Sequence, residues 1–151
     1  MTTAAAPDAI ALLRADHAAV GYLFAEYAGT HSVSDKKALV AEICAALRLH
    51  AQIEGDVFYP AVASALAGSP RASEAGDGHA DALDIIGELE GSDPDAKVDD
   101  AKVRRLALHV KQHARMAQNV TFPRVKASSL DLVEIGARMN KRKAELLERK
   151  A

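Results

Sequence analysis

The sequence predicts an all-α protein, an antiparallel four-helix bundle with an additional C-terminal helix. Residues that favour helix dominate the chain, whereas aromatic residues make up 4% and tryptophan is absent. Apolar residues recur at three- and four-residue spacing over long stretches, and we find no convincing alternating strand pattern. The 151 residues are enough to bury a core as a single domain over residues 1–151. Within it we expect the bundle over about 8–126 and the additional helix over about 129–150.

The first two helices follow from apolar stripes and from residues that begin and end helices. The first should run from about Asp8 to Ala28 and end at Gly29. Ser34 or Asp35 can cap the second helix. Pro60 falls inside the apolar stretch of this helix, so we expect a kink or the end of the regular helix there.

Three further helices complete the prediction. The third spans roughly Ala72 to Leu89 and precedes a loop rich in glycine, aspartate and proline. The fourth carries an apolar stripe that ends near Pro123. Ser128 or Ser129 can cap the fifth helix, over Leu130 to Leu147. Because the loops are short, we expect neighbouring helices to be antiparallel.

Composition excludes several classes of protein. The balance of 19 basic and 21 acidic residues argues against a nucleic-acid binder, which would show a basic face. The single cysteine, Cys44, excludes an internal disulfide framework. No apolar run approaches the roughly 20 residues that span a bilayer, and the N-terminus is a poor signal peptide. We therefore expect a cytoplasmic protein with no membrane partner. No motif indicates a particular protein partner.

Histidines recur in matching order along the chain. Four of them lie at apolar-stripe positions, one on each bundle helix: His17, His50, His79 and His113. Pro60 follows His50 by ten residues, and Pro123 follows His113 by ten. The chain therefore resembles two copies of a two-helix unit, whose histidines would face a common axis.

A metal ion explains this pattern better than four separate buried histidines. Burying imidazoles without partners is costly, and neutral imidazole is the commonest protein ligand for metals. His50 and Glu54 form His-x-x-x-Glu. Four residues turn a helix by about 400°, so both side chains lie on one face, where the carboxylate can bridge two metals. Sites of this composition inside four-helix bundles are typical of di-iron proteins.

Over about Leu12 to Val125, the ordered motifs resemble the hemerythrin-like, HHE cation-binding family. The residues that carry the resemblance are Asp16-His17, His50-Ala51-Gln52-Ile53-Glu54, Phe58-Tyr59-Pro60, His79, His113 and Phe122-Pro123. The segment from Leu130 to Gly136 is similar to the extra helix of mycobacterial-type members. The resemblance implies a non-heme di-iron centre, with two irons per chain. It also implies a small ligand, either a diatomic molecule (O2 or nitric oxide) or peroxide.

The sequence departs from the family pattern at Ala117, where a second His-x-x-x-Glu would place a bridging glutamate. The second iron position is therefore in doubt. His109 lies one turn before His113 and either completes a three-imidazole set with His79 or lies beside the ligands.

Tyr59 occupies a position at which mycobacterial-type relatives use tyrosine as an iron ligand. A straight helix would place it about 180° from His50, although a kink or bulge at Pro60 could bring it round. The alternative is a core tyrosine with a hydrogen-bonded hydroxyl. Asp16, beside His17, either supports a ligand or is a surface carboxylate.

Two functions remain open from the sequence. The first is an iron-binding hemerythrin-like protein that binds or reacts with O2, nitric oxide or peroxide. The alternative is a metal-binding regulatory or interaction module, with a mononuclear or zinc site and no turnover. The missing glutamate at position 117 favours the alternative, whereas the four aligned histidines argue against a metal-free bundle.

Overall fold

The protein folds into antiparallel helices whose order follows the predicted one. The computed structural model describes residues 6–67, 72–93 and 95–149, with the backbone alone for 72–79. In chain order the elements are α1 (Ala9–Ala28), α2 (Val33–Ile53), the π-helical turn η1 (Glu54–Phe58), α3 (Tyr59–Leu66), α4 (Ala72–Glu90), α5 (Asp100–Met116), the π-helical turn η2 (Ala117–Thr121), α6 (Phe122–Ala127) and α7 (Leu132–Glu148).

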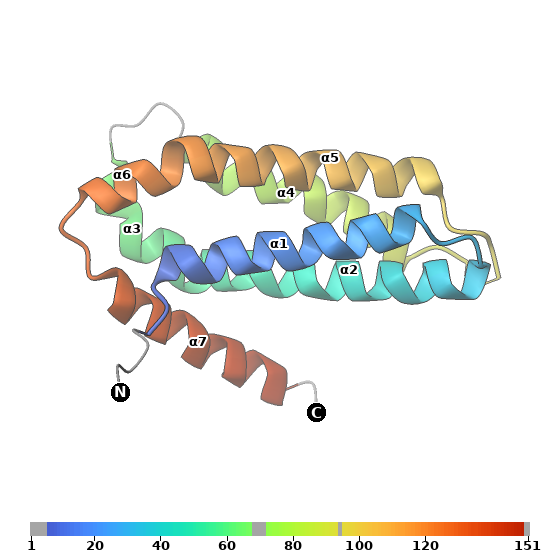
Figure 1. The fold of residues 1–151 in the computed structure, drawn as a ribbon, viewed down its shortest axis with the longest axis horizontal. Coiled ribbons are helices and arrows are strands. Elements are labelled where there is room, and N and C mark those ends of the chain that lie inside the picture. Colours follow the sequence, from blue (N-terminus) through green and yellow to red (C-terminus); the bar gives the residue numbers. More distant parts are fainter. Residues whose placement is uncertain (1–5, 68–71, 94, 150–151) are drawn as a thin grey trace.

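Figure 1 shows the arrangement of these helices. α1 and α2 lie side by side and antiparallel, α4 pairs with α5, and α2 also contacts α4. At one end of the bundle, α3 continues the direction of α2 beyond η1, and α6 continues that of α5 beyond η2. α7 crosses the N-terminal end of α1. The predicted all-α bundle with an additional C-terminal helix is confirmed. None of the described helices is long and apolar enough to cross a membrane.

The first residues of the helices correct two sequence predictions. Asp8, the residue near which α1 was expected to begin, caps this helix by accepting a hydrogen bond from the Ala11 N–H at 2.8 Å. Ser32, rather than Ser34 or Asp35, caps α2, because its extended backbone lets the side chain accept from the Asp35 N–H. Asp131 caps α7 in the same way, in place of the predicted Ser128 or Ser129.

Pro60 and Pro123 each lie just beyond a π-helical turn, and the helix continues past them. The Tyr59 N–H bonds the Glu54 carbonyl five residues back, and the Phe122 N–H bonds the Ala117 carbonyl in the same way. The kink or end of regular helix expected at Pro60 is therefore a local widening in front of the proline. Because η1 and η2 each begin four residues after a histidine, the two halves share their local geometry, as the repeat predicts.

The described core consists of two apolar clusters. The cluster nearer η1, η2 and α7 includes Ile10, Leu13, Ile53, Phe58, Phe122 and Met139. The cluster at the other end of the bundle includes Val20, Ile43, Leu47, Ile86 and Leu106. On α1, α2 and α5, the chain between these clusters carries His17, His50 and His113 respectively. The fold therefore places a polar layer between two apolar ones.

α7 packs closely on the start of α1. A Cβ atom on Gly136 would lie 2.9 Å from the Pro7 carbonyl oxygen and 3.0 Å from the Ala9 nitrogen. The Arg142 Nε atom donates to the Asp56 carboxylate of η1 at 3.0 Å. The additional helix α7 is therefore docked against the start of α1 and against η1.

We predict that Gly136→Ala lowers the free energy of unfolding, measured by urea denaturation, by about 1–3 kcal/mol. The added methyl group would meet backbone atoms, which cannot move aside as a flexible side chain can. Gly21→Ala in α1 is the matched control, since beyond the neighbouring backbone of its own helix nothing lies within 4 Å of its Cβ position. That control should stabilise the helix by about 0.5–1 kcal/mol. Equal responses of the two variants would contradict the close docking of α7.

Candidate metal centre

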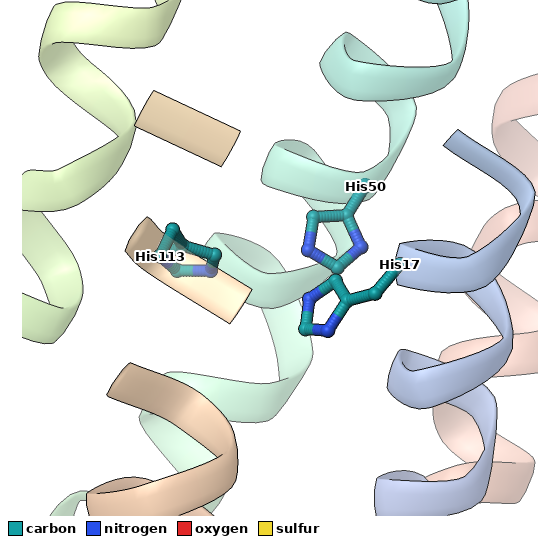
Figure 2. Close-up of side chains that lie close together, drawn as sticks. All are labelled: His17, His50 and His113. Atoms are coloured by element: carbon teal, nitrogen blue, oxygen red, sulfur yellow. The ribbon is translucent and has the colours of Figure 1, made fainter. Parts of the chain in front are cut away.

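Three imidazole rings from three helices meet in the polar layer. His17 lies on α1, His50 on α2 and His113 on α5, and Figure 2 shows the rings turned toward one another. Their centroids are separated by 5.1 Å (His17 to His50), 5.9 Å (His17 to His113) and 6.1 Å (His50 to His113). One nitrogen of each ring lies within 4.8 Å of the others, which suits ligands of a shared metal site.

Glu54 brings a carboxylate into the same layer. Its side chain is buried, and its Oε1 atom lies 2.6 Å from His50 Nε2 and 3.3 Å from His113 Nε2. The four-residue spacing to His50 places both side chains on one helix face, as predicted. Glu54 therefore connects the ligands of α2 with the ligand of α5.

The surroundings shift the pKa values of two of these histidines in opposite directions. Burial, reinforced by His50, lowers the pKa of His17 to about 4. For His50, burial alone would lower the value, but the negative charges of Glu54 and Asp16 and their hydrogen bonds raise the pKa to about 10. Without metal, one ring is therefore held neutral and the other protonated.

The donor set fits a metal ion. His17 Nε2 is buried and has no hydrogen-bond partner among the described residues, which is costly for a polar atom unless a ligand completes the site. Three imidazoles and a carboxylate are ligands that iron and zinc accept. The described residues thus provide four donors for one ion, and a carboxylate such as that of Glu54 has two oxygen atoms with which to contact metal.

Tyr59 is brought to the same side as Glu54. Burial, followed by the charge of Glu54 and a hydrogen bond with it, raises the pKa of the Tyr59 phenol. The π-helical turn between them changes the angular position that a straight helix would give, so the straight-helix placement opposite His50 does not hold. In this structure Tyr59 is a partly buried tyrosine that packs against the core and hydrogen-bonds with Glu54, and its role as a ligand stays a prediction.

The second half of the repeat lacks both of these polar groups. Ala117 stands where Glu54 stands in the first half, and Phe122 stands where Tyr59 stands. Ala117 and Phe122 are both buried in the first apolar cluster. The Phe122 ring lies parallel to His17, with centroids 6.4 Å apart. Beside His50 and His113, the centre therefore has two further polar groups on the α2 side and two apolar ones on the α5 side.

Of the three remaining histidines, one lies beside the cluster, one is exposed and one has a side chain outside the described residues. His109 is partly buried and lines a cavity of about 30 Å³ beside His17, His50 and His113, but it is not part of the three-histidine cluster. The side chain of His79 lies outside the described residues. His31 is exposed, and Cys44 is buried in the apolar cluster at the other end of the bundle.

We predict that the metal-free protein loses stability on both sides of about pH 6.5, which is the ordinary pKa of a histidine side chain. His17, with its lowered pKa, contributes stability above that pH, which is lost as the pH falls toward about 4. His50, with its raised pKa, contributes stability below it, which is lost as the pH rises toward about 10.

The check is the melting temperature of the metal-free protein against pH. His17→Gln should flatten the acidic side of the curve, and His50→Gln the alkaline side. The control is His31→Gln, because that side chain is exposed. Curves with the same shape in all three variants would show that the layer does not hold these two protonation states.

Comparisons with known proteins agree with this picture. Residues 8–125 match the family model described as Hemerythrin HHE cation binding domain. None of the curated proteins matches the chain. A crystal structure of a hemerythrin HHE cation binding domain-containing protein, the Rv2633c homolog from Mycobacterium kansasii, is similar to this chain with a TM-score of 0.73. The two are 22% identical, and the match covers 92% of this chain and 86% of that chain, so the likeness shows the fold alone. Because the family model spans most of its length, the chain belongs to the hemerythrin HHE cation-binding family.

Proposed function

We propose that the protein binds non-heme iron in the histidine layer and that this centre binds or reacts with O2, nitric oxide or peroxide. The observation that carries the proposal is the convergence of three imidazoles on a buried layer where His17 Nε2 has no other described partner. Membership of a cation-binding family supports the metal, and the donor types support iron.

The proposed ligands are His17, His50, Glu54 and His113, which would hold one ion between α1, α2 and α5. Iron in such a site supplies an open coordination position for a small ligand. Glu54 would replace its present contacts with the two histidines by contacts with the ion, and Tyr59 would keep the carboxylate oriented by its hydrogen bond. The negative charge of Glu54 would then offset part of the positive charge that the ion brings into the layer.

The cavity beside the ligands supports a small substrate. Its volume is about 30 Å³, and its walls are mostly apolar: Val20, Leu47, Ala51, Ala82, Leu83, Ile86 and Val110. A space of this size holds about one water-sized molecule. The apolar walls would keep bulk water and larger solutes away from the centre.

The resemblance implies two irons per chain, and we propose that His109 and His79 serve the second one. A specific observation favours a second candidate, a mononuclear or zinc-bearing site without turnover. The α5 side of the centre carries Ala117 and Phe122 in place of a carboxylate and a phenol, so its described donors are fewer. Counting metal ions in the purified protein separates the two candidates.

We predict that His17→Ala, His50→Ala and His113→Ala each reduce bound iron by more than half, measured on protein purified from iron-supplemented cells. Each change removes one of four donors from the proposed ion. His31→Ala is the control, because its exposed side chain lies outside the cluster. Equal iron content in the parent, the three variants and the control would reject the site.

We predict that Ala117→Glu raises the iron content toward two per chain and slows its loss to chelators. The new carboxylate would stand where Glu54 stands in the other half. Without metal it would be a buried charge, which costs several kcal/mol. The variant should therefore melt lower than the parent when metal-free and higher when iron-loaded. If it melts lower in both states and binds no extra iron, position 117 does not serve the centre.

A further inference from the structure

Asp16 contacts a proposed ligand on a different helix. Its Oδ2 atom lies 3.0 Å from His50 Nδ1, so a carboxylate of α1 meets an imidazole of α2. Its neighbour in sequence, His17, turns instead toward the cluster. Two adjacent residues of α1 thus have different relations to the centre: Asp16 contacts the proposed ligand His50, whereas His17 is a proposed ligand itself.

This contact determines how the His50 ring is presented. When Nδ1 donates its proton to a carboxylate, the neutral ring carries no proton on Nε2, which can then bind a metal. Nε2 is the atom that faces Glu54, at 2.6 Å. The same hydrogen bond also restricts rotation of the ring, because its two nitrogens are engaged on opposite sides.

A role in local helix structure does not explain Asp16. It lies in the interior of α1, well after the capping residue Asp8. Aspartate is among the weaker helix formers at interior positions. Within the described part of the chain, the Asp16 carboxylate forms its ion pair with His50 of another helix. The position therefore calls for another reason, and the hydrogen bond to His50 provides one.

The surroundings of Asp16 keep the carboxylate in contact with water. The side chain is 33% exposed. Asp16, Val20 and His50 line both the internal cavity and an outer pocket of about 170 Å³, whose wall includes Lys143 of α7. Asp16 therefore needs no second buried partner, and the cationic group that shares its outer pocket comes from the additional helix.

We propose that Asp16 is a positioning residue of the metal centre, which fixes the His50 ring with Nε2 toward the metal through the Nδ1 hydrogen bond. This inference rests on the proposed metal centre. It assigns to α1 a second contribution, since α1 would both provide a ligand and orient the ligand of α2.

The test compares Asp16→Ala with Asp16→Asn in the intact 151-residue chain, using Zn²⁺ as a diamagnetic probe. Removing a carboxylate that orients a ligand histidine typically weakens metal affinity roughly 10- to 100-fold, and we expect this loss for Asp16→Ala. The amide oxygen of Asp16→Asn can still accept from Nδ1, so this variant should retain most of the affinity. Asp56→Asn is the control, since Asp56 contacts Arg142 and no histidine in the described structure.

A second readout separates positioning from folding. In the zinc-loaded parent, nuclear magnetic resonance should show a His50 Nδ1–H proton that exchanges slowly with water. The signal should persist in Asp16→Asn and in the control, and exchange rapidly in Asp16→Ala while the helical circular dichroism stays unchanged.

Three results would overturn the inference. Unchanged affinity and an unchanged Nδ1–H signal in Asp16→Ala would show that the hydrogen bond does not position His50. Equal loss of affinity in Asp16→Asn and Asp16→Ala would show that Asp16 is itself a ligand, because an amide is a poor substitute for a carboxylate. Failure of the parent to bind Zn²⁺ or iron would overturn the proposed centre as well, whereas the first two results would leave that centre intact.

Discussion

Four polar side chains lie between two apolar clusters, and the bundle has to satisfy them away from bulk water. His17, His50 and His113 come from three helices, and Glu54 joins two of the rings through one oxygen atom. Burying such groups is unfavourable unless each has a partner. The relative positions of α1, α2 and α5 are therefore constrained by this layer as well as by the apolar packing on each side of it.

The two π-helical turns set the direction of the side chains that come after His50 and His113. In the first half, η1 brings the Tyr59 hydroxyl to Glu54, whereas in the second half η2 leads from Ala117 to Phe122, whose ring covers His17. One local geometry thus serves a polar pair in one half and an apolar pair in the other. This difference in side chains on a shared backbone pattern makes the centre unsymmetrical.

Much of the fold could be predicted because helix periodicity and the histidine repeat both depend on local spacing. Helix geometry also predicts that His50 and Glu54 share one face, and the structure shows them in contact. The predicted caps were wrong, since spacing does not distinguish Ser32 and Asp131 from nearby polar residues that compete for the same role. The role of Asp16 stayed open, because its contact crosses from one helix to another and a helix pattern carries no information about the neighbouring helix.

Crystals of the iron-loaded protein, measured at the iron absorption edge, would test the proposed centre most directly. We predict an anomalous peak in the layer at ordinary coordination distances, about 2.0–2.2 Å, from nitrogen atoms of His17, His50 and His113 and from a Glu54 oxygen. Iron bound only at surface carboxylates, or an iron position out of reach of His17 Nε2, would contradict the proposed centre.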